Sequence, residues 1–210
     1  MSSEVAICNI ALSRIGAYPI ANFTDASKEA RECNTLYTYI RDSVLRDHKW
    51  SFATKRTILA ELNETCSGYD YVYAYPSDCL VAHEIYNDTG DLSGVAYDYT
   101  TDTYYPTGKI EFEVASSSTL TNKIILSNKE AAELIYTARI TDTNMYDTIF
   151  IDAFAYRLAA ELAITIKGSG QLTQSLYQLY MNRIGQAKAV SANEGFRKPD
   201  NNNTFTNSRL

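Results

Sequence analysis

The sequence predicts an α+β protein: an antiparallel helical bundle made of an N-terminal and a C-terminal helical hairpin, with an inserted antiparallel β-sheet or sandwich domain and an extended C-terminal arm. Apolar residues recur at helical spacing at both ends of the chain and alternate at period two in the middle, and the last segment is polar. Each hairpin needs a partner for its apolar face, so we expect the two to pack together. The predicted boundaries are 1–62, 63–142, 143–190 and 191–210.

Two amphipathic segments predict the first hairpin. A helix is expected over 4–15, with Ser3 as its N-cap and Gly16 as its stop. A longer helix is expected over 25–47, with Asp25 as its N-cap and Arg41 on its polar face. Its apolar face is formed by residues spaced three and four apart: Ala26, Ala30, Cys33, Tyr37, Ile40 and Val44. We expect these two helices to form an antiparallel hairpin.

The only tryptophan, Trp50, follows the second helix within the segment His48-Lys49-Trp50-Ser51-Phe52-Ala53. A large aromatic side chain at the end of an apolar helix face buries a large area. We therefore predict that Trp50 lies in the core, at the end of the bundle.

The middle of the chain is predicted to be an antiparallel sheet or sandwich. Residues 54–62 are expected to be extended or weakly helical, and Tyr69 to Tyr75 alternate with other residues at strand period. Turn residues follow at 87–91 and 106–109. Further strands are expected over 82–86, 95–100, 110–114, 123–126 and 133–140.

Helical spacing returns after Asp142 and predicts the second hairpin. Its first helix is expected to run through Ile166, and its second from Leu172 to Ala187. Between them, Gly168 is suited to end one helix and Ser169 to cap the next. The arm, 191–210, is poor in apolar residues and is expected to be disordered in isolation.

Composition restricts the classes of function. The formal charge of −6 and the pI near 5.0 argue against nucleic-acid binding as the main activity, because phosphate binding needs concentrated lysine and arginine. The four cysteines are scattered, which favours a reducing compartment. We expect no signal peptide at the N-terminus and no membrane-spanning segment.

The residues that could carry chemistry are few. There is no Gly-x-Ser-x-Gly elbow for a serine nucleophile, and Cys79 with His83 would be a remote cysteine–histidine pair on one strand. No zinc spacing is present, and the acidic run at 87–91 is explained by a turn. Glu111 and Glu113 share a strand face, as in a hydrolase, but solvated strand faces have the same pattern. We predict no catalytic residues, no metal and no cofactor.

Tyrosine and the arm leave a binding function open. The chain has 17 tyrosines, and Tyr97, Tyr99, Tyr104 and Tyr105 lie in a turn-rich stretch, where an interface and plain strand propensity explain them equally well. The arm is either a frayed terminus or a segment that orders on a partner. Its candidate partner-binding residues are Phe196, Arg197, Lys198, Phe205, Arg209 and Leu210.

Three groups of residues in order along the chain resemble the head-tail adaptor proteins of short-tailed bacteriophages, also called tail tubular protein A or tail accessory factors. The first is Val5 to Ala17 with Asp25-Ala26-Ser27 and Arg41 to Ala53. The second is Tyr73-Ala74-Tyr75-Pro76-Ser77-Asp78-Cys79-Leu80, similar to the family's Tyr-x-x-Pro-x-Asp-Cys step into the sheet. The third comprises Tyr136, Asp142, Phe150 and Phe154 to Ala159.

Membership would imply a non-enzymatic structural protein of the virion, in the tail or neck, which is in the host cytoplasm during assembly. Such proteins form a twelve-fold ring beneath the portal, lengthen the DNA channel and receive the tail nozzle or fibres. The expected partners are the portal protein, a tail nozzle or fibre protein, and other copies of the chain, with DNA passing unbound. The rivals are a tail-associated cell-wall or polysaccharide hydrolase using Glu111 and Glu113, and a carbohydrate-binding module using exposed tyrosines.

Overall fold

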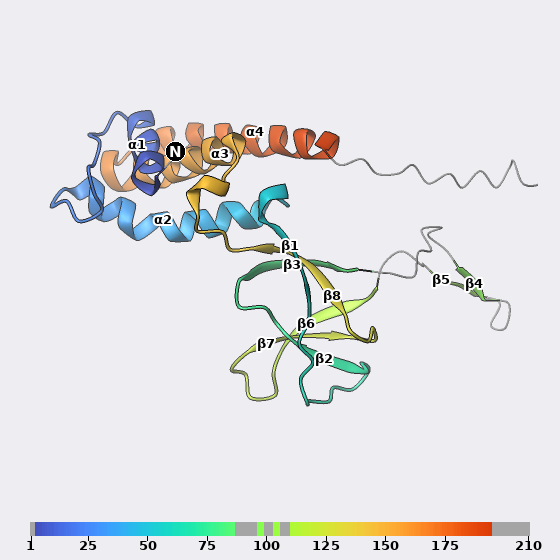
Figure 1. The fold of residues 1–210 in the computed structure, drawn as a ribbon. Coiled ribbons are helices and arrows are strands. Elements are labelled where there is room, and N and C mark those ends of the chain that lie inside the picture. Colours follow the sequence, from blue (N-terminus) through green and yellow to red (C-terminus); the bar gives the residue numbers. More distant parts are fainter. Residues whose placement is uncertain (1–2, 87–95, 99–102, 106–109, 195–210) are drawn as a thin grey trace, which may run out of the picture. The chain divides into compact units, whose positions relative to one another are not determined.

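The computed structural model describes residues 3–86, 96–98, 103–105 and 110–194. Within these ranges the protein is mixed α and β, with four α-helices and two small three-stranded antiparallel sheets (Figure 1). The chain divides into two compact units. The helical unit draws on Met1–Thr54 and Thr137–Gly195, and the β unit on Lys55–Tyr136.

Helix α1, Glu4–Arg14, has the predicted ends. The hydroxyl of Ser3 accepts a hydrogen bond from the backbone N–H of Ala6 at 3.1 Å, which satisfies one of the free amides of the first turn. Beyond the C-terminus, Gly16 adopts a φ of 64°, the left-handed conformation that stops a helix. The side-chain amide of Asn9 then fixes the following loop, because it both donates to and accepts from the backbone of Ile20.

Helix α2, Lys28–Asp47, begins later than predicted. Its N-cap is Ser27, whose Oγ accepts from the N–H of Ala30 at 3.1 Å, so the assignment of Asp25 as the cap was wrong. Asp25 instead accepts hydrogen bonds from the amides of Ala21 and Asn22, because an Asp carboxylate satisfies turn amides as readily as helix amides. Arg41, expected on the polar face, is only 5% exposed. Its guanidinium is neutralised by Asp42 at 2.8 Å.

The second pair of helices has the predicted connection. Helix α3, Thr148–Leu162, continues into a π-helical turn, Ala163–Lys167, and Gly168 follows with a φ of 65°. Ser169 accepts a hydrogen bond from Leu172 at 3.3 Å, close to the start of α4, Gly170–Glu194. The predicted arm therefore begins too early, because 191–194 are helical and contain neither proline nor glycine to end the helix.

Helix α3 lies at the centre of the helical unit, in contact with α1, α2 and α4. Contact between α1 and α2 is minor, so their expected direct pairing into a hairpin was wrong. Both helices instead cover α3, whose surface is apolar on several sides. Small alanines let neighbouring helices approach, and the buried residues of α3 are Phe150, Ala153, Phe154, Ala155, Leu158, Ala159, Ala160 and Leu162.

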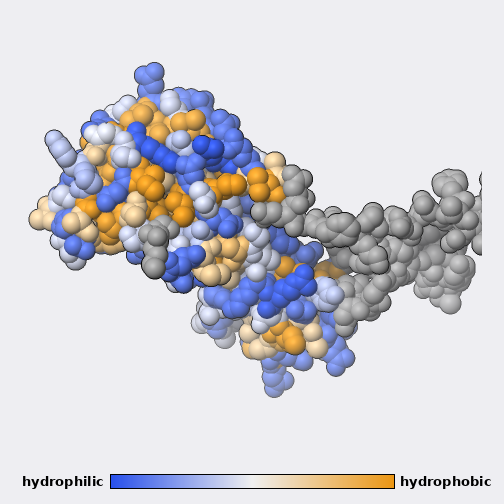
Figure 2. Space-filling model, turned by 45° about the horizontal axis from the view of Figure 1, so that its top comes forward, coloured by the Kyte–Doolittle hydropathy of each residue, from blue (hydrophilic) through white to orange (hydrophobic). Residues whose placement is uncertain are grey.

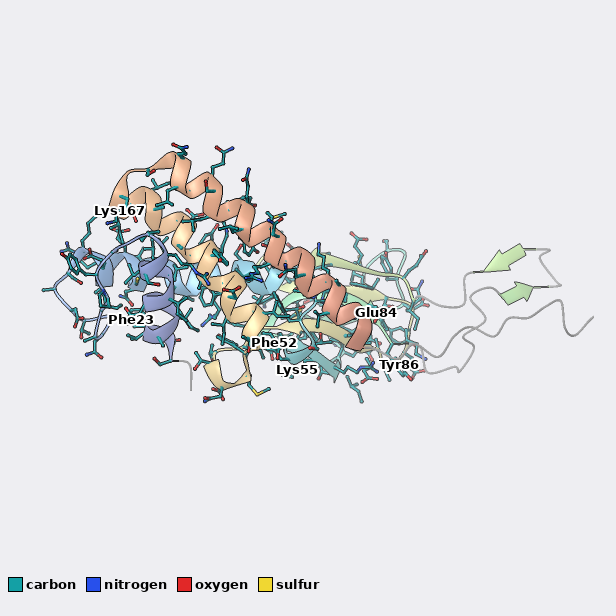
Figure 3. All side chains as sticks on the ribbon, turned by 90° about the horizontal axis from the view of Figure 1, so that it is seen from above. Phe23, Phe52, Lys55, Glu84, Tyr86 and Lys167 are labelled. Carbon is teal, nitrogen blue, oxygen red and sulfur yellow. The ribbon has the colours of Figure 1, made fainter. Side chains whose placement is uncertain are left out.

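An aromatic cluster joins the two halves of the helical unit. The ring of Phe150 lies 5.1 Å from Trp50, 5.1 Å from Phe52 and 4.7 Å from Tyr146, measured between ring centroids. Trp50 is 3% exposed, and its indole N–H donates to the carbonyl of Val44 at 3.0 Å. The prediction that Trp50 belongs to the core is confirmed. Figure 3 shows Phe52 toward one end of the helical unit.

The opposite end of the helical unit is closed by the loops (Figure 3). Lys167 donates from Nζ to the carbonyl of Gly16 at 2.8 Å, which links the π-helical turn to the end of α1. The ring of Phe23 packs 5.9 Å from Tyr37 of α2. These contacts fix the connection between α1 and α2.

The first sheet of the β unit has the strand order β1-β8-β3. Its strands are β1, Thr54–Ile58, β8, Glu133–Ala138, and β3, Cys79–Ile85. The segment 54–62, left between extended and helical by the sequence, therefore begins as a strand. Residue Leu62 after β1 donates to Val72 of the second sheet at 2.8 Å, so this segment links the two sheets.

The second sheet has the order β2-β7-β6, and its register pairs Tyr73 with Ile125 and Val114 with Ile125. Its strands are β2, Tyr71–Ala74, β6, Phe112–Ser116, and β7, Lys123–Ser127. A separate hairpin pairs β4, Ala96–Asp98, with β5, Thr103–Tyr105. β5 was not predicted as a strand, because surrounding turn residues obscured its short period.

Two buried tyrosines of the helical unit provide a matched test of this packing. Tyr180 donates to Asp47, whereas the hydroxyl of Tyr37 is buried without a partner among the described residues. We expect Tyr180→Phe to lower the free energy of unfolding by about 1 kcal/mol and Tyr37→Phe to leave it unchanged or raise it. Urea unfolding followed by Trp50 fluorescence measures both. Equal losses in the two variants would contradict the assignment.

Candidate functional site

A groove on the helical unit lies between α1, α3 and α4 and has a volume of about 330 Å³. We call it the arginine groove. Its walls combine isoleucine side chains with two arginines and one aspartate, and the lining residues are Ile10, Arg14, Thr148, Ile149, Ile151, Asp152, Arg183 and Gln186. The groove exists because α1 and α4 both pack on α3, which leaves a channel along the α3 surface.

Asp152 organises the charges of the groove. It forms an ion pair with Arg14, and its backbone carbonyl accepts a second hydrogen bond from Arg14 at 3.0 Å. Arg183 of α4 contacts the other carboxylate oxygen of Asp152 at 2.6 Å. Two guanidinium groups therefore share one carboxylate, which leaves a formal excess of one positive charge. The ring of Tyr156 lies 3.5 Å from the guanidinium carbon of Arg14 and holds it from another side.

This combination is typical of a protein-binding surface. Arginine is enriched at protein interfaces, because a planar guanidinium buries well and still donates hydrogen bonds. The apolar wall is accessible, since Ile10 is 39% exposed. The groove therefore offers apolar area for burial beside donors that can fix the orientation of a partner.

Helix α4 carries apolar side chains on both sides of its buried stripe. At 100° per residue, Leu179 and Val190 share a flank with Arg183, whereas Tyr177 and Met181 lie on the other flank. All four apolar side chains are between 40% and 51% exposed. Figure 2 shows hydrophobic residues gathered on the face of the helical unit that this view presents.

The β unit holds a polar cluster built around Asp78. Tyr136 of β8 donates to one carboxylate oxygen at 2.9 Å, and Lys55 donates to the other at 2.7 Å. Burial favours the neutral carboxyl group, but hydrogen bonds from Lys55 and Tyr136 outweigh it and lower the pKa of Asp78. The pKa of Lys55 is raised by the same hydrogen bond to Asp78.

A second, more polar hollow of about 430 Å³ lies beside this cluster in the β unit. Pro76 and Ser77, next to Asp78, line it, and Lys123 lies 5.4 Å from the ring of Tyr75 within its wall. The other lining residues are Leu62, Ala74, Cys79, Thr121 and Asn122. This hollow has the polar and aromatic character of a glycan-binding surface, but its only charged lining residue among those described is a lysine.

The predicted arm residues, Phe196, Arg197, Lys198, Phe205, Arg209 and Leu210, lie outside the described residues, as does the acidic run 87–91. Partner binding by the arm stays a prediction.

The chemical candidates are placed as follows. Glu113 lies on β6 and accepts a hydrogen bond from Tyr69 at 3.4 Å, and exposed Glu111 immediately precedes that strand. Cys79 and His83 both lie on β3. Among the candidate interface tyrosines, Tyr97 pairs with Tyr104 in the β4–β5 hairpin. The structure adds no further catalytic group beside any of these residues that it describes.

Two searches of the described residues gave negative results. No group of three or more His, Cys, Asp or Glu side chains is placed to hold a metal ion. No helix in these ranges has the length and apolar character needed to cross a bilayer.

Sequence reasoning missed the arginine groove. Asp152 and Arg183 look like ordinary polar positions on amphipathic helices, and nothing in their spacing indicates a partner in α1. An aspartate inside the otherwise apolar run 149–155 was the one available signal, because a charge among apolar residues of a buried helix needs a counter-ion.

The Asp78 cluster predicts a pH dependence of stability. Because the folded-state pKa of Asp78 is lowered, its contribution is present above the unfolded-state pKa of about 3.9 and is lost as the pH falls below it. We expect Asp78→Asn to be less stable than wild type at pH 6, with the difference shrinking by pH 3. Urea unfolding at both pH values measures this, and Asp70→Asn serves as an exposed control. A difference independent of pH would contradict the role of Asp78.

No protein-family model matches this chain, and no curated protein sequence is similar to it. Membership of the head-tail adaptor family stays a prediction from the motifs.

Proposed function

We propose that the chain is a head-tail connector of a bacteriophage. In this role, the two terminal helical pairs form one bundle with the β domain inserted between them. Copies of the bundle assemble as a ring beneath the portal protein, extend the DNA channel, and present a surface to a tail nozzle or fibre protein. The protein acts structurally in the neck of the virion, without a catalytic centre of its own.

The observation that carries this proposal is that the separate motifs of the resemblance contact one another. Asp78, from the Tyr-x-x-Pro-x-Asp-Cys segment, accepts a hydrogen bond from Tyr136, which belongs to the third group of motifs, at 2.9 Å. Trp50, from the first group, packs 5.1 Å from Phe150 of the third. Residues that were matched only by order along the chain thus form joint structural contacts, as expected of a genuine family pattern.

The exposed apolar surfaces support assembly into a ring. A closed ring needs heterologous contacts, in which one surface of a subunit meets a different surface of its neighbour. The arginine groove and the Tyr177–Met181 flank of α4 are two distinct apolar surfaces of the same unit. The formal charge of −6 also suits a channel through which DNA slides, because an acidic wall repels phosphate.

The proposal is tested by mixing the purified protein with the portal protein of the same phage. We expect a stoichiometric ring on the portal, seen by electron microscopy, and a mass increase in light scattering. The absence of association at micromolar concentrations would overturn the proposal. A cell-wall turbidity assay with wild type and with Glu111→Gln/Glu113→Gln distinguishes the hydrolase: lysis that disappears in the double variant would replace the structural role.

Surface variants test the heterologous contact. We expect Ile10→Glu in the groove, or Met181→Glu on the other flank, to prevent ring formation on the portal, because either places a charge in every subunit contact. Leu120→Glu, at an 82% exposed position of the β unit, is the control and should leave assembly unchanged. Circular dichroism verifies that each variant is folded.

A mixture of the two defective variants gives a sharper result. One intact groove can still meet one intact flank, so the mixture should form heterodimers but no closed rings. Closed rings from either variant alone would show that the groove and this flank are not the subunit contact, even if portal binding persisted.

A further inference from the structure

The minor contact between α1 and α2 involves two buried thiols. Cys8 lies on α1 and Cys33 on α2, and each is 0% exposed. Both are free cysteines, and their side chains are hydrogen-bonded to each other. Two thiols that touch from different helices are in a different position from isolated core cysteines, because their sulfur atoms are already neighbours.

The environment makes the two sulfur atoms unequal. The hydrogen bond from Cys8 raises its own pKa and lowers the pKa of Cys33, since the thiol of Cys8 stabilises a neighbouring thiolate. A thiolate is the nucleophile in thiol–disulfide exchange. Cys33 is therefore the attacking group and Cys8 the resolving group. The other two cysteines, Cys66 and Cys79, belong to the β unit.

We propose that Cys8 and Cys33 form a disulfide that cross-links α1 to α2 when the protein meets a small-molecule disulfide oxidant such as oxidised glutathione. The Cys33 thiolate attacks a glutathione sulfur, forms a mixed disulfide and releases one glutathione thiolate. Cys8 then loses its proton and displaces the second glutathione. The two protein thiols are oxidised by two electrons, and one glutathione disulfide is reduced to two thiols.

This cross-link would supply a connection that packing provides only weakly. α1 and α2 are held mainly through α3, so a covalent bond between them restrains the unfolded chain across the whole α1–α2 loop. Its biological setting rests on the proposed function: a virion protein is assembled in a reducing cytoplasm and then enters oxidising surroundings. The chemistry itself does not depend on that function.

The test uses the full chain with Cys66→Ser and Cys79→Ser, which removes the thiols of the β unit. After incubation with oxidised glutathione, we expect intact-mass measurement to show a monomer that has lost two hydrogen atoms, and peptide mapping to join the fragments that contain Cys8 and Cys33. Because both thiols are buried, the reaction should accelerate in urea concentrations below the unfolding transition. The unfolding temperature of the oxidised protein should rise and return on reduction.

Cys8→Ala and Cys33→Ala in the same background are the controls, and each should yield only glutathione adducts or free thiol. Peptide mapping of oxidised wild type gives the same answer should a variant fail to fold. Persistence of two free thiols, stable glutathione adducts on both cysteines, or cross-links only between chains would overturn the proposal. None of these results depends on portal binding, so the disulfide and the connector role fail separately.

Discussion

The burial of α3 is the constraint on which the helical unit depends. Phe150 and Phe154 are fully buried, and between them and the end of the helix lies a series of alanines that other helices approach closely. A helix that is apolar on several sides is stable in water only when several partners cover it. α1, α2 and α4 provide that cover, and Trp50, Phe52 and Tyr146 cover its N-terminal part.

Covering α3 has consequences for the surface. Because α1 and α4 approach it from different sides, the arginine groove is left between them, and Asp152 serves as the shared counter-ion of an arginine from each. The buried stripe of α4 is directed at α3, which leaves both flanks of α4 exposed. The surfaces that we propose for ring assembly are thus a product of the same packing that stabilises the unit.

Local chemistry was predictable from the sequence, and long-range pairing was not. The Ser3 cap, the Gly168–Ser169 turn and the burial of Trp50 each depend on one or two neighbouring residues, and all were predicted correctly. Ser27 and Asp25 were both competent N-caps, and helix geometry selected the former. The coverage of α3, the buried ion pair of Arg41 and the arginine groove depend on residues far apart in the chain, which a single sequence does not pair. Order along the chain nevertheless anticipated the Asp78–Tyr136 and Trp50–Phe150 contacts.

The most direct test of the central role of α3 is the free energy of unfolding of Phe150→Ala, measured in urea by Trp50 fluorescence. Loss of a fully buried phenylalanine that contacts three other rings should cost about 3–5 kcal/mol. Ile164→Ala, at a 53% exposed position in the π-helical turn that follows α3, should change stability by less than about 0.5 kcal/mol. Similar small losses in both variants would contradict the account, because they would show that the aromatic cluster does not hold the helical unit together.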